Sequence, residues 1–210
     1  MKVSNGTTIL GIQCIDGVVL AADMRATTGS YIAIRDTNKI TDISPNIYVC
    51  HSGSSSDTQA LSSFAKYFQN VLQVNAEDHK KPQVSVIAQV MRKLIQGNKG
   101  RLLAQMIVGG YDESGPALFE VMQSGMAIKR QFATGGSGSL YISSYCDLYF
   151  KEGMTMEEAT KFAIRAVNLA IIRDGMSGGP INIVQISAEG AKRHYVLPKD
   201  QPNDASIVRT

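Results

Sequence analysis

Six polar residues, spread over most of the chain, are the candidates for chemistry. They are two acids, a cation and three hydroxyl side chains: Thr7, Asp23, Lys39, Ser137, Asp174 and Ser177. Taken singly, each has an ordinary structural interpretation. A threonine suits a strand because it is β-branched, Asp23 would end a strand at a turn, and Lys39 would be a solvated charge. Ser137 would belong to a Gly-rich loop that begins a helix.

Two details favour a common site. Asp174 lies at the carboxyl end of a predicted helix, where the helix dipole disfavours a carboxylate, so we expect a Lys or a free amine beside it. In addition, Asp16-Gly17 between two apolar segments predicts a β-hairpin. Centred on that dipeptide, the hairpin would place Thr7 opposite Ala26, with Asp23 close by along the sheet.

Other classes of function find little support. The net charge is only +3 and no basic block is present, which disfavours a nucleic-acid partner. Apolar segments are too short for a membrane span. Neither His/Cys/Asp/Glu spacing typical of a metal site nor a phosphate-binding loop with its lysine occurs. Three scattered cysteines, Cys14, Cys50 and Cys146, indicate buried thiols in a reducing compartment.

The hydrophobic pattern predicts the elements that must position the candidates. Strands are expected at 7–13, 18–23, 46–52, 103–112, 117–123, 127–132, 181–187 and 193–198. Helices are expected around 61–72, with Ser54 or Ser56 as N-cap, and around 86–95, 140–150 and 155–174, the last opened by a capping box of Thr155 and Glu158. This order predicts one α+β domain of mostly antiparallel sheets, each covered by helices on its outer face. A polar surface tail begins at Lys199.

In order, the segments "GTTILGI", "GVVLAADMRATTGSYIA", "NKIT", "HSGSSSDTQ", "TGGSGSLYISSYCD" and "RDGMSGG" contain the six candidates. Together they resemble proteasome beta subunits, which are N-terminal-nucleophile hydrolases, from Gly6 to about Pro198. The segments "RATTGSYIA" and "GSGS…YCD" are most similar to the catalytic subunit with caspase-like, post-acidic cleavage. The resemblance implies a four-layer αββα sandwich with two antiparallel sheets between helix layers.

The same resemblance implies how the protein is processed, where it assembles and what it cleaves. Residues 1–6 would be a short propeptide, cut between Gly6 and Thr7, and residues 7–210 a single catalytic domain. The partners would be the other alpha and beta subunits of a stacked-ring 20S core, in cytoplasm and nucleus. The substrates would be unfolded, ubiquitin-targeted polypeptides. No cofactor, metal, nucleic acid or membrane is expected.

The resemblance also assigns roles to the residues. Thr7 would be the nucleophile, and its freed α-amino group, with an ordinary pKa of about 7.7–8.0, would be the base. Lys39 would be a fixed positive charge held by Asp23, and the backbone N–H of Gly53 would stabilise the oxyanion. The amine and a nearby water would be positioned by Ser137, Asp174 and Ser177, while Thr8 would remain a strand residue.

A substrate pocket is implied at seven positions, Ala26, Thr27, Ala33, Thr37, His51, Ser55 and Gln59. Caspase-like subunits carry Arg where this chain has His51. Because His is largely neutral at pH 7, we expect a weakened acidic preference, extended to small or branched apolar residues. Any acidic preference carried by His51 should rise as the pH falls through the ordinary His range.

Three alternatives remain open at this point. The chain could be a non-catalytic beta subunit that keeps its leader, although a scaffold has no need of the six candidates. It could be a bacterial-type two-tier threonine protease, which shares the leading Thr-Thr but lacks the "RATTGSYIA" and "RDGMSGG" context. Outside the family, it could be a globular binding protein with buried thiols.

Overall fold

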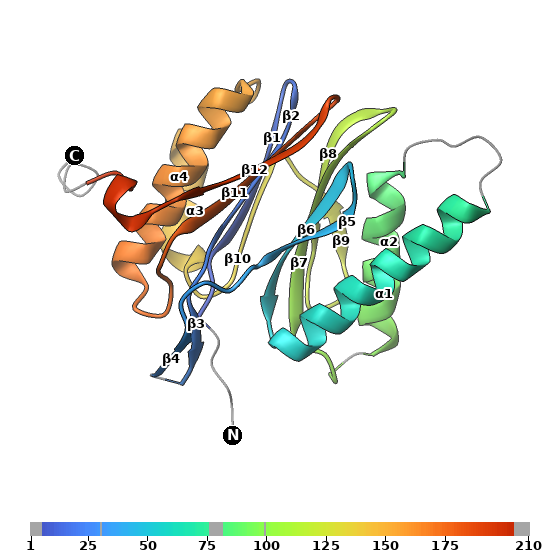
Figure 1. Cartoon of the computed structure of the whole chain (residues 1–210), viewed down its shortest axis with the longest axis horizontal. Coiled ribbons are helices and arrows are strands. Elements are labelled where there is room, and N and C mark those ends of the chain that lie inside the picture. Colours follow the sequence, from blue (N-terminus) through green and yellow to red (C-terminus); the bar gives the residue numbers. More distant parts are fainter. Residues whose placement is uncertain (1–5, 30, 76–81, 99, 204–210) are drawn as a thin grey trace.

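Two five-stranded antiparallel sheets face each other, and a pair of helices covers the outer face of each (Figure 1). The structure is a computed structural model that describes residues 6–29, 31–75, 82–98 and 100–203. This arrangement confirms the predicted αββα sandwich. Residues 1–5 of the predicted propeptide and 204–210 of the predicted tail lie outside the described residues.

The first sheet carries the amino-terminal hairpin. Its strand order is β10 (Phe132–Gly135), β1 (Ile9–Cys14), β2 (Gly17–Asp23), β11 (Ile181–Ser187) and β12 (Gly190–Val196). The second sheet has the order β5 (Ile40–Ser44), β6 (Ile47–Gly53), β7 (Ala104–Asp112), β8 (Gly115–Val121) and β9 (Ala127–Lys129). A small ribbon of β3 (Ala26–Thr28) and β4 (Tyr31–Ile34) extends from the end of β2.

The helices form where the apolar stripes predicted them. They are α1 (Ser55–Val74) and α2 (Val84–Gly97) on the second sheet, and α3 (Ser139–Tyr149) and α4 (Met156–Arg173) on the first, with a short 3-10 turn at Pro198–Asp200. Ser54 caps α1. Thr155 and Glu158 form the predicted capping box of α4, which fixes where this long helix begins. The helix ends at Arg173, with Asp174 as its C-cap.

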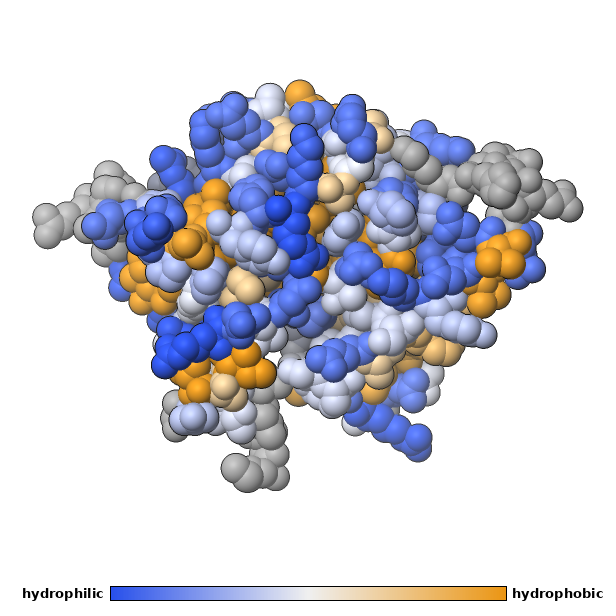
Figure 2. Space-filling model, in the orientation of Figure 1, coloured by the Kyte–Doolittle hydropathy of each residue, from blue (hydrophilic) through white to orange (hydrophobic). Residues whose placement is uncertain are grey.

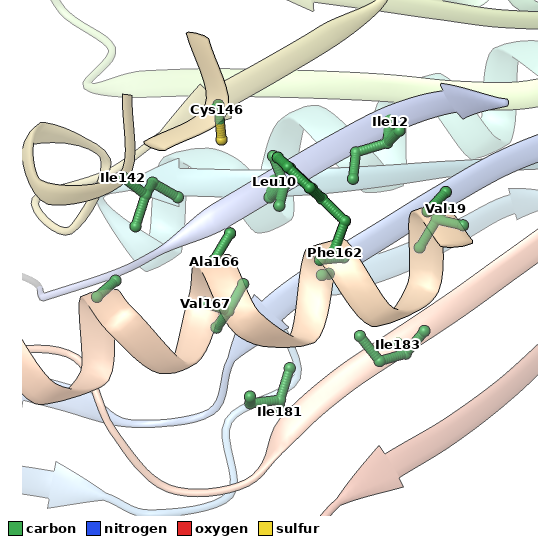
Figure 3. Packing of buried hydrophobic residues seen from close by; sticks show 14 of the residues in the cluster. Leu10, Ile12, Val19, Ile142, Cys146, Phe162, Ala166, Val167, Ile181 and Ile183 are labelled. Atoms are coloured by element: carbon green, nitrogen blue, oxygen red, sulfur yellow. The ribbon is translucent and has the colours of Figure 1, made fainter. Parts of the chain in front are cut away.

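Three hydrophobic layers hold the four structural layers together. One packs α3 and α4 against β1, β2 and β11, with Leu10, Phe162 and Ile183 among its residues (Figure 3). A second fills the space between the two sheets, with Leu20 and Ile107. A third lies under α1 and α2. Because β2 lies between two of these layers, all its residues are buried, as its continuous apolar sequence predicts.

The predicted hairpin register is wrong by one position on each strand. Cys14 pairs with Gly17 and Ile9 with Ala22, so the turn is centred on Ile15-Asp16. At the position that Gly17 takes in β2, a Cβ would lie 2.1 Å from the carbonyl oxygen of Ile186 on β11. Only glycine fits there, which favours this register over the predicted one. The predicted placement of Thr7 opposite Ala26 is therefore wrong, since Ala26 pairs with Ile34 in β4. Thr8 lies across from Asp23, whose N–H donates to the Thr8 carbonyl (3.1 Å).

The structure divides one of the predicted strands into two. Residues 127–132 were expected as a single strand, but β9 pairs with β8 in the second sheet and β10 pairs with β1 in the first. Arg130 and Gln131 make the crossing between the sheets. Hydrophobic alternation does not reveal a change of sheet, because both halves pack apolar residues against a hydrophobic layer, Ala127 in β9 and Ala133 in β10. The crossing matters because β10 leads directly into the segment that carries Ser137.

Candidate active site

A buried ion pair lies at the end of the amino-terminal hairpin. The Lys39 Nζ donates to Asp23 Oδ1 at 2.6 Å, and both side chains are buried. The Asp23 carboxylate also accepts from the backbone N–H groups of Thr8 (2.8 Å), Gly178 (2.9 Å) and Arg25 (3.2 Å). Burial lowers the pKa of Lys39, and the charge of Asp23 opposes that change. The interpretation of Lys39 as a solvated charge is therefore wrong.

The Thr7 hydroxyl and the Lys39 ammonium converge on one carbonyl. Thr7 Oγ1 donates to the carbonyl oxygen of Gly6 at 2.7 Å, and Lys39 Nζ donates to the same oxygen at 3.1 Å. Gly6 N–H donates to Thr27 Oγ1 at 2.8 Å. The carbonyl of the peptide bond between Gly6 and Thr7 is thus contacted by a hydroxyl and a cation, and Thr27 holds the preceding N–H.

The nitrogen of Thr7 begins a second set of hydrogen bonds. It donates to Ser137 Oγ at 3.1 Å, and Ser137 Oγ donates to Asp174 Oδ2 at 2.7 Å. Ser177 Oγ donates to the same Asp174 oxygen at 2.7 Å. All six candidates are therefore brought together. Thr7, Asp23, Ser137 and Ser177 lie at one end of the first sheet, next to the ends of β1, β2, β10 and β11. Lys39 comes from the segment before β5 and Asp174 from the end of α4.

Asp174 is stabilised differently from the expectation. The sequence predicts a Lys or a free amine beside this carboxylate at the end of α4. Its hydrogen bonds come instead from the two serine hydroxyls and from the Met176 N–H (3.1 Å). Lys39 acts on it through space, since the charge of Asp174 raises the pKa of Lys39.

Close backbone contacts explain two glycines of the site. A Cβ on Gly6 would lie 2.2 Å from the Cβ of Met176, and one on Gly136 would lie 2.1 Å from the carbonyl oxygen of Thr7. Gly136 also has a φ of 83°, a conformation that side chains disfavour. The backbone around Thr7 is therefore enclosed from two sides.

Gly53 ends β6, the strand that carries His51. Its φ is 116°, and a Cβ there would lie 2.2 Å from the Leu103 carbonyl oxygen. Glycine is thus required by the backbone at this position. Its role in stabilising an oxyanion stays a prediction.

The predicted pocket residues differ in exposure. Thr27 is buried, Ala26, Thr37 and His51 are partly exposed, and the others, Ala33, Ser55 and Gln59, are exposed. His51 Nε2 lies 3.3 Å from Thr41 Oγ1. Burial, with a smaller effect from Lys39, lowers the pKa of His51 to about 4. The expectation that His51 gains charge through the ordinary His range must therefore be corrected, because its protonation falls near pH 4. A common pocket of these seven residues stays a prediction.

Two residues near the site were not predicted. Thr8, expected to be a plain strand residue, is fully buried, and its Oγ1 lies 2.7 Å from Ser177 Oγ. Arg25 donates from Nη1 to the Gly175 carbonyl (3.2 Å) in the loop after α4. The sequence signal that could have found Thr8 is the Thr7-Thr8 pair itself, because it puts a second hydroxyl next to the candidate Thr7.

Comparison with known proteins decides the family. A family model described as "Proteasome subunit" matches residues 3–186. The chain belongs to the proteasome subunit family.

Several curated relatives of this proteasome family member are beta subunits. The chain is 42% identical to "Proteasome subunit beta type-6" of Arabidopsis thaliana over 194 residues, covering 91% of this chain and 82% of the relative. It is 40% identical to the protein of the same name from Dictyostelium discoideum over 198 residues (94% and 92%). It is 38% identical to "Proteasome subunit beta type-1" of Saccharomyces cerevisiae over 200 residues (95% and 92%). The resemblance to proteasome beta subunits is thereby confirmed.

The described residues contain neither a group of metal-ligand side chains nor a helix that could span a membrane. Among residues 6–29, 31–75, 82–98 and 100–203, no three His, Cys, Asp or Glu side chains are grouped as metal ligands would be. No helix in the same part of the chain has the length and apolar character needed to cross a membrane.

Proposed function

We propose that this chain is a catalytic beta subunit of the 20S proteasome core, a threonine endopeptidase whose nucleophile is Thr7. One observation carries the proposal. The Thr7 hydroxyl and Lys39 ammonium both contact the Gly6 carbonyl oxygen, at 2.7 and 3.1 Å, which is the carbonyl that a maturing enzyme must attack. A structural subunit has no use for a buried cation at that oxygen.

Maturation would follow from this geometry. Thr7 Oγ1 attacks the Gly6 carbonyl carbon, and Lys39 stabilises the negative charge that develops on the Gly6 oxygen. The bond between Gly6 carbon and Thr7 nitrogen breaks, and that nitrogen takes up the hydroxyl proton. The resulting ester between Gly6 and Thr7 Oγ1 is hydrolysed by water, which releases the leader as a carboxylate. Thr7 is left with a free amine.

Peptide cleavage would use the same groups. The freed amine keeps Ser137 as its neighbour, and its ordinary pKa of about 7.7–8.0 lies close to working pH, so it can take the Thr7 hydroxyl proton. Lys39, paired with Asp23, favours the neutral amine and the developing alkoxide by its charge. The substrate carbonyl oxygen would be stabilised by the backbone N–H of Gly53.

Specificity would differ from that of an Arg-containing caspase-like pocket. With its pKa lowered to about 4, His51 is neutral at pH 7. A neutral imidazole can bond a carboxylate but does not supply the charge or the two parallel N–H donors of Arg. We therefore propose weakened post-acidic cleavage, with small or branched apolar residues also accepted.

Assembly with the other alpha and beta subunits belongs to the same proposal. The face drawn in Figure 2 is mainly hydrophilic with separate hydrophobic patches. Large apolar side chains are exposed on α3, where Leu140 is 82% and Leu148 75% exposed. Such side chains are a reason for a monomer to associate. The free, buried cysteines fit the reducing cytoplasm and nucleus.

The test is Thr7→Ala in assembled particles, with Thr160→Ala as the control at a buried threonine of α4. Particles are assayed with post-acidic, post-basic and post-hydrophobic peptides, and the chain is sequenced from its amino terminus. Loss of one activity in Thr7→Ala, with Thr7 as the first residue of the wild-type chain, supports the proposal. Unchanged activities and a retained leader in the wild type would identify the non-catalytic alternative instead.

A further inference from the structure

Thr8 connects the ion pair of Asp23 and Lys39 with the hydrogen bonds around Asp174. Its backbone N–H donates to Asp23 Oδ1 (2.8 Å), and its hydroxyl lies 2.7 Å from Ser177 Oγ. The side chain is completely buried. The steps proposed above use neither of these groups, and a strand residue needs no buried hydroxyl pair.

The direction of each hydrogen bond around Asp174 follows from counting protons. A carboxylate only accepts, whereas each hydroxyl has one proton to donate. Ser177 gives that proton to Asp174 Oδ2, and Ser137 does the same, since that oxygen is 2.7 Å from Ser137 Oγ and the Thr7 carbonyl oxygen is 3.4 Å away. The Thr8 hydroxyl must therefore donate to Ser177, and Ser137 must use a lone pair to accept from Thr7 N–H.

We propose that Thr8 is a positioning residue that, through Ser177 and Asp174, fixes the hydrogen bonding of the Thr7 amine. The inference rests on the proposed function. In the mature enzyme the amine would donate one N–H to Ser137 and keep its lone pair free for the Thr7 hydroxyl proton. A residue at the second position of the mature chain would thus orient the base at the first.

Close packing around the Thr8 hydroxyl leaves no room for a water molecule to take its place. A Cβ on Gly138 would lie only 1.9 Å from Thr8 Oγ1, so the Gly138 backbone packs against the hydroxyl. In Thr8→Val a methyl group occupies that volume, and no water fits in place of the lost donor. The packing is kept while the hydrogen bond to Ser177 is removed.

The sign of the effect follows from charge. The charged groups that act on Lys39, the cation beside Thr7, are Asp23, Asp174 and Arg25, and Lys39 in turn acts on His51. Without the Thr8 donor, Ser177 is less polarised and donates more weakly to Asp174. The less compensated carboxylate then favours the ammonium form of Thr7, which raises the pKa of the amine and requires a higher pH for activity.

The experiment compares Thr8→Val, Thr8→Ser and Thr160→Val in assembled particles. Thr160 is a matched control because it is also buried, and its hydroxyl bonds Met156 and Gln185 far along α4. The readout is kcat and KM against pH, with the peptide whose cleavage Thr7→Ala abolishes. To remove any effect on maturation, each chain is also produced as a fusion whose removal exposes Thr7, and rates are expressed per mature terminus.

We expect Thr8→Val to lower kcat at pH 7 about tenfold with little change in KM, and to move the acidic limb up by about one pH unit. Thr8→Ser should move that limb back, while Thr160→Val should leave it in place. A Thr8→Val profile that superimposes on wild type, or an equal shift in Thr160→Val, would overturn the inference. If Thr7→Ala itself keeps every activity, the proposed function fails, which is a distinct result.

Discussion

Substitution of His51 by Arg offers the sharpest test of the proposed specificity. Burial and the nearby Lys39 lower the pKa of His51 to about 4. At pH 7 only about one His51 in a thousand then carries a charge, against about one in four for an ordinary histidine with a pKa of 6.5. Arg is charged at every working pH, so His51→Arg adds a cation that the wild type lacks.

The size of the effect can be bounded. A hydrogen bond to a charged partner contributes about 1.5–3 kcal/mol, which is about 10-fold to 150-fold in a rate constant. Lys39 opposes the new charge, as it opposes protonation of His51. The lower end is therefore expected, about a tenfold rise in kcat/KM for Glu relative to Leu at the cleaved position.

The assay uses two fluorogenic peptides that differ only in Glu or Leu at that position, so their ratio cancels differences in particle concentration. In the wild type the ratio should stay flat from pH 8 to about 5.5, because His51 stays neutral and the Glu side chain of the peptide stays charged throughout that range. His51→Gln, which is neutral and polar, serves as the control and should match the wild type at pH 7. A wild-type ratio that rises with an apparent pKa between 6 and 7 would refute the electrostatic reasoning, and an unchanged ratio in His51→Arg would remove His51 from the pocket.

Other perturbations have equally direct outcomes. Asp23→Asn should reduce cleavage at least about a hundredfold, because one amide oxygen cannot accept from the four donors around this carboxylate; a variant that still removes its leader at the normal rate would contradict this. Gly136→Ala should lose far more activity than Gly115→Ala, since both have positive φ but only the first Cβ meets the backbone of Thr7; equal kcat values would show that crowding is unimportant. Thr155→Ala should lower the stability of α4 by about 1 kcal/mol, seen as a lower melting temperature with unchanged kcat, whereas an unchanged melting temperature would mean that the capping box contributes nothing measurable.

Much of the fold could be predicted because local patterns decide it. The apolar stripe and capping box of α4 specify a helix from Met156 to Arg173, and the continuous apolar sequence of β2 specifies a strand covered on both faces. The hairpin register could not be predicted from its turn. The contact between Gly17 and Ile186 that fixes it is formed with a strand more than 160 residues away in the sequence.

The candidate site, too, could be predicted only in part from the sequence. Residue types and their motifs singled out Thr7, Asp23 and Lys39 without any coordinates. They could not show that Thr8 shares the network, because a buried hydroxyl and a plain strand threonine look alike in a sequence. Nor could they give His51 its lowered pKa, since desolvation and the charge of Lys39 depend on packing. The sequence alone determined the residues and the elements that carry them, whereas distances, hydrogen-bond direction and protonation were decided by tertiary contacts between segments far apart in the chain.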